Sequence, residues 1–593
     1  MRRRRVLQAG AGLTAGIAAL SLIGCGSDDS GSEPEDKSGL LTQATDSTSK
    51  AKKGGVWLSS FQNDTPHFDG MLGGSSPWWE NHFAYGYLVK APVFNKTKGE
   101  EIDTSVTGDV AESWEQSPDG LTITFKLRPN AGLDPRPPTS GRNLDADDVV
   151  LAWNRFVATS SNKRQLSYEA NKEAPIESIT AVDKNTVRAK LAFPSASVLA
   201  ALADYRNFML VPREVDGGYD PKKEMRGSGP WMLDNYQPSI GFSYKRNPNY
   251  WDKERPYLDG IERPIISEYA AGLAQLKAGN LATWNVRAED IIATKNDAPH
   301  LDMYQVDQYT ATNRSIGFSF KEGSPFRDER VRRAASMLID RDLFIDATTN
   351  AEEFNKQGLP VDKAWFTLLT GSDLPFYIDP QSSAFGASSQ WLKYNPEEAK
   401  KLIRAATGKD TIETKWTYTT NGYNSSYIVE QEILKNMLEA EGDFKFSIEA
   451  VDFTSVFTPK LRFVDSEGRR PEFDGMAYFN FSGAPDPDII LASYYMPGAT
   501  EYRMEPDWPN DAKFNQLTSA QRTELNEEKR VAIIQDVQRH HIDKMYTIPR
   551  PGDAKAFTLW QPYMQNLYVY GNRLSAPLAN NVWLYYWRDQ SIG

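Results

Sequence analysis

The sequence predicts an α/β fold with more than one lobe, in which strands and helices are mixed. Segments of period-two and of helical periodicity follow one another without strict alternation. About 540 of the 593 residues remain after an N-terminal leader and linker, which is more than one hydrophobic core normally serves. The formal net charge is −12 and the mean hydropathy is −0.56. We therefore expect an acidic, soluble body that does not bind nucleic acid.

The chain begins with the features of an export signal. Arg2–Arg5 form a basic block, and residues 6–24 carry no charge, which is the order expected of a signal peptide over residues 1–24. An uncleaved membrane helix is the alternative, because about 19 uncharged residues nearly span a bilayer. The abundance of Gly, Ala, Ser and Thr in the run disfavours that alternative. Residues 2–10 also resemble a twin-arginine signal, so the export route stays open.

Cys25 is the only cysteine of the chain, so it forms neither an internal disulfide nor a cysteine zinc site. With Leu22-Ile23-Gly24 before it, the segment resembles the lipobox of bacterial lipoproteins, in which the cysteine thiol receives a diacylglyceryl group. The resemblance implies that Cys25 is the lipidated first residue of the mature chain and holds it at a membrane. Residues 25–53 are rich in small, polar and charged side chains and predict a flexible tether.

Local patterns in the body predict both strands and helices. Residues 112–128 predict a β-hairpin, because Pro118-Asp119-Gly120 is a turn signal and apolar residues alternate from Leu121 to Leu127. Apolar stripes at helical spacing occur in residues 147–156, 323–341 and 395–406. In the last of these, Asn395 is the expected N-cap.

Seven stretches of the chain carry a family resemblance. They are residues 110–133, 144–156, 227–251, 256–266, 324–342, 394–406 and 484–495. The most specific are the Gly-Ser-Gly-Pro block that begins at Gly227 and the Pro-Phe-Arg-Asp block that begins at Pro325. Together they resemble the peptide/nickel-binding branch of the extracytoplasmic solute-binding proteins, the soluble receptors of ABC importers. Both blocks are structural rather than catalytic, so they identify the fold better than the ligand.

The resemblance implies a two-lobe, periplasmic-binding-protein-like fold with mixed sheets, an extra subdomain in the first lobe and a two-segment hinge. Lobe I would comprise residues 54–305 and 552–593, with the subdomain at about 97–226, and lobe II residues 306–551. The resemblance also implies an extracytoplasmic monomer that captures a peptide or another small solute between its lobes. The lobes would close over the solute, and the receptor would deliver it to ABC permease subunits.

The loop over residues 479–488, which contains Phe481, borders the ligand in this family. Peptide-binding members carry an aspartate there that pairs with the ligand amine, and Gly483 stands at that position. The Asp486-Pro487-Asp488 sequence in the same loop fits a turn better than a catalytic dyad, because proline fixes φ and aspartate caps. Asp486 is nevertheless a candidate ligand contact.

A second loop and an aromatic segment complete the predicted site. Asn421 and Tyr423 stand where dipeptide binders carry an arginine and a tyrosine for the ligand carboxylate. Trp78 and Trp79 align with a helix start that faces the cleft, and aromatic faces suit apolar, sugar-like or cationic ligands. Because neither charged anchor is present at its aligned position, we expect neutral or cationic ligands rather than zwitterionic dipeptides.

Two other classes of function are open to the same sequence. An extracytoplasmic hydrolase is disfavoured, since the chain lacks the Gly-x-Ser-x-Gly, His-Glu-x-x-His and Walker patterns. The adjacent histidines His540 and His541 would point about 100° apart on a helix and make a poor chelate. We therefore expect neither a metal nor a cofactor. A ligand-binding sensor or chaperone module of the same fold is the remaining alternative.

The lipobox resemblance predicts that Cys25→Ser releases the protein from membranes, because residue 25 can then receive no diacylglyceryl group. Two acyl chains anchor stably, with each buried CH₂ adding about 0.8 kcal/mol. Fractionation after a high-salt wash measures the effect, with Ser30→Ala as the control that leaves the lipobox intact. A Cys25→Ser protein that still sediments with membranes would place the anchor elsewhere.

Overall fold

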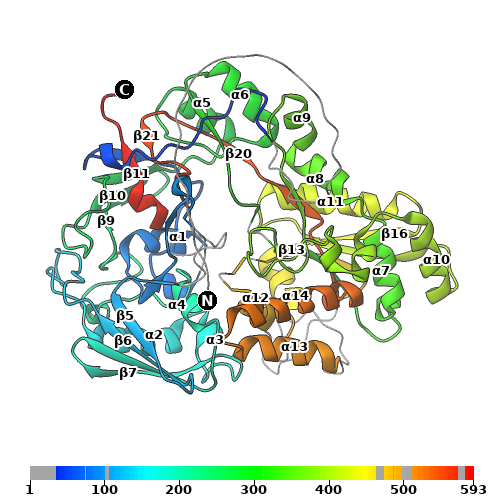
Figure 1. The fold of residues 1–593 in the computed structure, drawn as a ribbon, viewed down its shortest axis with the longest axis horizontal. Coiled ribbons are helices and arrows are strands. Elements are labelled where there is room, and N and C mark those ends of the chain that lie inside the picture. The colour runs from blue at the N-terminus through cyan, green and yellow to red at the C-terminus, as the bar shows by residue number, and fades with distance from the viewer. Residues whose placement is uncertain are drawn as a thin grey trace, which may run out of the picture.

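The computed structural model describes residues 35–73, 75–100, 106–310, 313–462, 473–481, 483–484, 486–496, 499, 501, 511–571 and 581–592. Figure 1 shows two lobes side by side, joined at one end by strands that cross between them. None of the helices in these ranges has both the length and the apolar content needed to cross a bilayer.

The first lobe is built on a four-stranded sheet. Its strands, in spatial order, are β1 (Val56–Leu58), β11 (Gly260–Pro264), β10 (Gly241–Arg246) and β9 (Trp231–Gln237). β1 pairs with β11 in parallel, and the other pairs are antiparallel. The main helices of this part are α1 (Ser75–Ala84), α5 (Tyr269–Lys277) and α6 (Ile291–Asp297). Short strands extend it: β2 (Val89–Lys90), β3 (Phe94–Asn95), β4 (Thr107–Gly108), β21 (Met564–Gln565), β22 (Tyr570–Gly571) and β23 (Trp587–Arg588).

A second sheet in lobe I forms a separate antiparallel unit. Its order is β5 (Ala111–Gln116), β6 (Thr122–Leu127), β8 (Thr186–Leu191) and β7 (Ile176–Asp183). The pairing of β5 with β6 confirms the predicted hairpin, and Gly120 takes a φ of +71° in its turn, where glycine carries no steric penalty. The helices of this unit are α2 (Ala146–Thr159), α3 (Lys163–Leu166) and α4 (Val198–Ala203). α2 confirms the helix predicted over residues 147–156.

Lobe II is built on a mixed five-stranded sheet. Its order is β16 (Phe444–Val451), β15 (Ile412–Thr419), β17 (Met476–Phe481), β13 (Asn313–Phe318) and β18 (Thr547–Pro549). Its helices are α7 (Glu329–Met337), α8 (Arg341–Thr349), α9 (Ala351–Lys356), α10 (Pro396–Thr407), α11 (Ser425–Glu439), α12 (Pro487–Tyr494), α13 (Ala512–Thr523) and α14 (Glu527–Lys544). Asn395 caps α10 as predicted, accepting a hydrogen bond from the Glu398 amide at 3.1 Å. The two lobes and their mixed sheets confirm the predicted fold class.

Two chain segments cross between the lobes, and each end of the crossing is a β-ladder. On the side of lobe I, β12 (Asp302–Gln305) pairs antiparallel with β20 (Phe557–Trp560). On the side of lobe II, β13 pairs antiparallel with β18. Between β18 and β20 along the chain, β19 (Gly552–Ala554) pairs antiparallel with β14 (Lys363–Trp365). Figure 1 shows β20 running across the junction.

The segment predicted as a flexible tether is bound to the body over residues 36–50, so that part of the prediction is wrong. The Lys37 amide donates to the Gly358 carbonyl at 2.7 Å. Ten residues further on, the Ser47 amide and hydroxyl donate to Asn566 Oδ1 at 2.9 and 2.8 Å. The prediction of a flexible segment considered only its low content of apolar side chains. It did not take into account the hydrogen bonds that the segment forms with the folded body.

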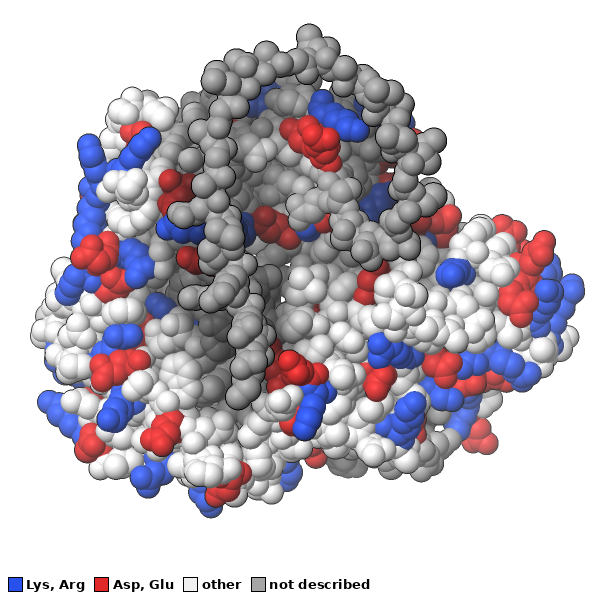
Figure 2. All heavy atoms as spheres, viewed as in Figure 1, with Lys and Arg blue, Asp and Glu red and all other residues white. Residues whose placement is uncertain are grey.

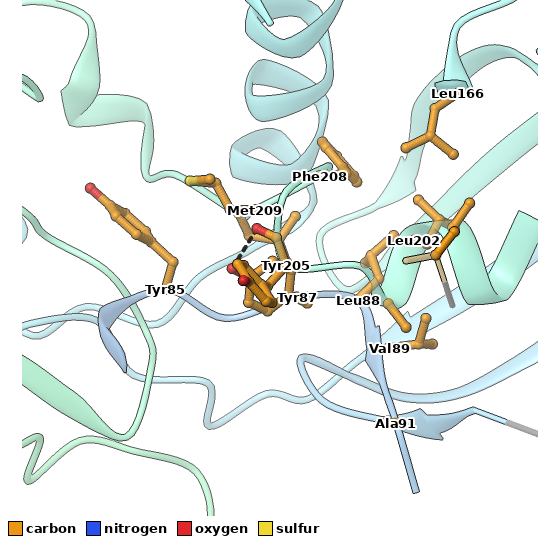
Figure 3. Close-up of a cluster of buried hydrophobic side chains, with 14 of the residues drawn as sticks. Tyr85, Tyr87, Leu88, Val89, Ala91, Leu166, Leu202, Tyr205, Phe208 and Met209 are labelled. Carbon is orange, nitrogen blue, oxygen red and sulfur yellow. Dashed lines mark hydrogen bonds between the residues drawn. The ribbon is translucent and has the colours of Figure 1, made fainter. Parts of the chain in front are cut away.

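The core of lobe I is rich in aromatic side chains, several of which are drawn in Figure 3. Tyr85 and Tyr87 keep only 3% and 1% of their surface exposed, so both are core residues. The Tyr87 hydroxyl donates to the Tyr205 carbonyl at 3.1 Å, the dashed line in Figure 3. This bond fixes the backbone that follows α4, which also carries Asp204 and Arg206.

A buried charge cluster holds the crossing strands to lobe II. Glu430 of α11 contacts Arg314 of β13 at 2.7 Å and Arg550, next to β18, at 3.2 Å. The Tyr478 hydroxyl donates to its other oxygen at 2.8 Å. Burial works against the charge of Glu430, but the two guanidinium groups hold the pKa of this carboxyl below its usual range.

This cluster predicts that Glu430→Gln strongly destabilises lobe II, because Arg314 loses its carboxylate partner and Arg550 is left with Asp553, at 3.3 Å. Breaking a buried pair in this way costs about 3–5 kcal/mol. Urea unfolding followed by tryptophan fluorescence measures the loss, with Glu432→Gln as the control, since Glu432 lies on the same helix and is exposed. Equal midpoints for the two variants would contradict the prediction.

Candidate functional site

The two tryptophans of α1 have different surroundings. Trp78 is half-buried, and its Nε1 donates to the Gly70 carbonyl at 2.8 Å. Trp79 keeps 39% of its surface exposed and stacks on Trp583 with ring centroids 6.2 Å apart. The Tyr205 ring lies 6.0 Å from the Trp79 ring. Trp79 therefore offers an aromatic face to a ligand, whereas Trp78 is tied into lobe I.

Arg206 reaches from lobe I to the loop of lobe II that contains Gly483. Its Nη2 donates to the Gly483 carbonyl at 3.1 Å, although the two residues are 277 positions apart. Its Nε donates to Asp204 at 2.9 Å, and Asp204 is fully buried. Burial works against the charge of Arg206, but the Asp204 carboxylate raises the pKa of the guanidinium above its usual range. Sequence reasoning found Gly483 and missed Arg206, because no local pattern brings them together.

Asn421 organises the turn that precedes Tyr423. Its Nδ2 donates to Asp452 Oδ2 at 2.8 Å, and its Oδ1 accepts from the Phe453 amide at 2.8 Å. Gly422 follows with a φ of +82°, and a Cβ there would lie 2.4 Å from a ring carbon of Phe453. Glycine is therefore required at this position. Both ends of the Asn421 side chain serve the turn, which sets the direction of Tyr423.

Tyr423 lies beside an arginine even though Asn421 occupies the aligned arginine position. Nη1 of Arg462 donates to the Tyr423 hydroxyl at 3.5 Å, and that hydroxyl donates to the Asn480 carbonyl at 3.4 Å. Nε of Arg462 donates to Glu501 at 2.8 Å. Burial works against the charge, but Glu501 holds the pKa of Arg462 above its usual range. A guanidinium thus does lie at this loop, supplied by a segment that sequence comparison did not point to.

The carboxylates of the Asp-Pro-Asp sequence form part of a helix start. Asp486 caps α12 by accepting from the Asp488 amide at 2.8 Å. It pairs with Arg530 at 2.8 Å, and Asp488 pairs with Arg522 at 3.0 Å. Burial works against the charge of Asp488, but these arginines hold its pKa below the usual range. Separate arginine partners support the turn interpretation over a catalytic dyad.

Phe481 is the last residue of β17, opposite Asn313 in β13. The side chain of Phe481 lies outside the described part of the chain. Its backbone position places it two residues before Gly483, at the end of a strand that leads from the core of lobe II to this loop.

The adjacent histidines of α14 each have a different partner outside this helix. His540 contacts Asp511, and Nε2 of His541 lies 3.1 Å from the Thr547 hydroxyl. Burial lowers the pKa of His541 to about 3, so the ring is neutral at physiological pH. Within the described ranges, no group of three or more His, Cys, Asp or Glu side chains is placed to hold a metal ion.

The candidate residues come from both lobes. In lobe I, the Tyr205 ring lies near Trp79, and the next residue, Arg206, donates to the Gly483 carbonyl of lobe II. In lobe II, Arg462 donates to Tyr423. Each guanidinium is paired with a carboxylate, so these residues offer aromatic rings and hydrogen-bond donors at little net charge, which are kinds of group that orient ligands in binding sites.

Comparison with known proteins agrees with this description. A family model described as bacterial extracellular solute-binding proteins, family 5 Middle, matches residues 105–502. The di/tripeptide-binding protein 2 of Pseudomonas aeruginosa is 24% identical over 461 residues, which cover 74% of this chain and 80% of that protein.

Two solved structures share the fold at low sequence identity. The ABC transporter-associated periplasmic binding protein DppA of Helicobacter pylori, in complex with the peptide STSA, superposes with a TM-score of 0.65 at 17% identity, covering 91% of this chain and 99% of that one. NikA of Brucella suis, in complex with Fe(III)-EDTA, superposes with a TM-score of 0.68 at 18% identity, covering 91% of this chain and 100% of that one. One fold thus holds a peptide in one protein and a metal chelate in the other.

The different surroundings of the two tryptophans predict different effects of mutation. Trp79→Ala should weaken binding of a copurifying ligand by roughly three- to tenfold, the effect of losing one aromatic contact, and should leave the melting temperature nearly unchanged. Trp78→Phe should cost about 1 kcal/mol of stability through its lost hydrogen bond and leave binding intact. Calorimetric titration and thermal unfolding of both variants measure this. Equal effects of the two substitutions on binding would contradict the assignment.

Proposed function

The chain belongs to family 5 of the bacterial extracellular solute-binding proteins, and on that basis we propose that it is a lipid-anchored receptor of an ABC importer. It captures a peptide-like or other small solute between its lobes and delivers it, chemically unchanged, to a membrane permease. The observation that carries the proposal is the contact between candidate segments of the two lobes, in which Arg206 of lobe I donates to the Gly483 carbonyl of lobe II at 3.1 Å.

The pairing of charges at the site favours a ligand that is held by hydrogen bonds and stacking. Three carboxylates near the candidate residues, Asp204, Glu501 and Asp486, each pair with an arginine, whereas Asp452 accepts hydrogen bonds from Asn421 and from its own turn. A ligand ammonium at any of the three paired carboxylates would have to displace an arginine. A peptide backbone offers acceptors to guanidinium donors without that cost, so we propose a ligand whose amine is blocked or lies away from this site.

The bound N-terminal segment supports a close attachment to the membrane. Eleven residues lead from Cys25 to Asp36, near the first contact with the body. Even a fully extended chain of that length reaches only about 40 Å. Lipidation at Cys25 would therefore confine the receptor to the membrane surface, where its encounter with a permease becomes effectively intramolecular.

Native mass spectrometry of the protein purified without its signal, followed by identification of what denaturation releases, tests the proposed function directly. The expected result is one bound solute per chain, recovered intact. Small-angle scattering of the stripped protein should then show compaction when that solute is returned. Recovery of an altered compound in molar excess over the protein would indicate an enzyme instead.

We predict that zwitterionic dipeptides bind far more weakly than the same dipeptides with an acetylated amine and an amidated carboxyl. A bound ammonium would break a buried pair such as Asp204–Arg206, and an unpaired buried charge costs about 3–5 kcal/mol, which is at least a hundredfold in affinity. Calorimetric titration of matched free and blocked dipeptides measures the ratio. Micromolar binding of the free forms would show that a carboxylate of this site accepts the amine.

A further inference from the structure

The lobes also meet on the side away from the hinge, through polar groups. The Ser197 hydroxyl, at the start of α4 in lobe I, donates to Asp488 Oδ2 in α12 at 2.8 Å. The neighbouring Ala196 amide donates to the carbonyl of Arg522, in α13, at 3.0 Å. Figure 1 shows α3 and α4 of lobe I next to α12 and α13 of lobe II, at the opposite end of the molecule from β20.

Arg522 joins these contacts into one network. Within lobe II, its Nε donates to Asp488 at 3.0 Å. Across the interface, its Nη1 donates to the Glu173 carboxylate at 2.8 Å and to the Glu173 carbonyl at 3.0 Å. Only 5% of the surface of Arg522 and of Asp488 is exposed, whereas the Glu173 side chain is 40% exposed. Arg522, Asp488 and Ser197, which is 4% exposed, are therefore buried in the contact, and Glu173 lies at its edge.

The contact combines these polar groups with apolar side chains of both lobes, among them Ala201 and Ile489. A cavity of about 40 Å³ lies within it, lined by Glu173, Ser197, Asp488 and Arg522 among others, and a space of that size has room for about one water molecule. Inter-lobe contacts of this kind separate readily, because water satisfies the same groups when they part. The β-ladders of the hinge are backbone pairings, and they stay hydrogen-bonded when the lobes part.

We propose that Glu173, Ser197, Asp488 and Arg522 form a reversible latch that holds the two lobes closed in the absence of ligand. This inference rests on the proposed function where ligand affinity is concerned. The apparent affinity of a receptor falls with the fraction of molecules whose conformation cannot bind the ligand. By favouring the closed arrangement, the latch keeps Arg206 in contact with Gly483 before a ligand arrives. It also slows entry, since the same contact must open to admit a solute.

The latch can be broken from lobe I without disturbing the buried pair of lobe II. The variant Glu173→Ala/Ser197→Ala removes one side-chain partner each from Arg522 and Asp488 and leaves their mutual contact in place. The matched control is Glu177→Ala/Ser178→Ala, which changes the same residue types on β7, where Glu177 pairs with Lys190 instead. Glu173→Ala alone serves as a milder variant should the double substitution affect folding.

Distances between spin labels report the lobe arrangement without any ligand. In a Cys25→Ser background the introduced cysteines are the only thiols. Lys223→Cys in lobe I and Lys445→Cys in lobe II are suitable label sites, because their side chains are 81% and 72% exposed. Pulsed electron paramagnetic resonance of the ligand-stripped protein then gives the closed and open populations.

We expect the parent and the control to show mainly the short distance. In the latch variant, the loss of two hydrogen bonds, one of them charged, should lower the closed-to-open ratio about tenfold. A parent that is already open without ligand, or a latch variant with the same distribution as the control, would overturn the proposal. Since no ligand is involved, this outcome is independent of whether the protein proves to be a solute receptor.

Discussion

The pairing of the two segments that cross between the lobes is the constraint on which the rest of the structure depends. β12 pairs with β20 on one side, and β13 pairs with β18 on the other. Because both crossings are tied by backbone hydrogen bonds at each end, the lobes can change their angle but cannot drift apart. That restriction lets Arg206 and Gly483, 277 residues apart, face each other reproducibly. A weak polar contact on the far side can therefore shift the angle between the lobes. The hinge already restricts their relative motion, so little further conformational entropy is lost on closure.

The N-terminal segment adds to the base of this hinge. The amide of Thr42 donates to the Met303 carbonyl in β12 at 2.7 Å. Leu40 and Leu41, beside it, pack on an apolar cluster that contains Phe354 of α9 as well as side chains of α5, α6 and β20. The cluster therefore joins a helix of lobe II to the helices of lobe I next to the crossing strands. The proposed lipid anchor at Cys25 would therefore join the body next to this cluster by the hinge, and not at the candidate binding residues.

Local chemistry made much of the fold predictable, and long-range contacts limited the rest. The hairpin at Gly120 and the cap at Asn395 depend on residues within a few positions of one another, and both are present. The turn interpretation of Asp486 followed from proline geometry in the same way. The sequence analysis did not identify Arg462 and Arg206, because each contacts a candidate residue that is distant in the sequence, and local sequence patterns do not predict such contacts. At the aligned loops, the guanidinium groups come from other parts of the chain, with Arg206 on Gly483 and Arg462 on Tyr423. The bound segment around Leu40 escaped for the same reason, since composition says nothing about what a neighbouring surface can pair with.

The arginines of the candidate site are paired with carboxylates, so the site carries charged groups but little net charge. Acidic and basic side chains are intermingled over both lobes on the face drawn in Figure 2, and the candidate site repeats this at short range, with Asp204 on Arg206 and Glu501 on Arg462. A guanidinium that is paired with a carboxylate can still donate hydrogen bonds from its other N–H groups. It therefore selects a ligand by the positions of the ligand's acceptor atoms and not by the ligand's net charge. Hydrogen bonds and stacking of this kind gain strength when water is excluded, which happens only when the lobes are together. In the proposed receptor, affinity would therefore depend on closure, so residues at the hinge and at the far contact would contribute to it together with Trp79.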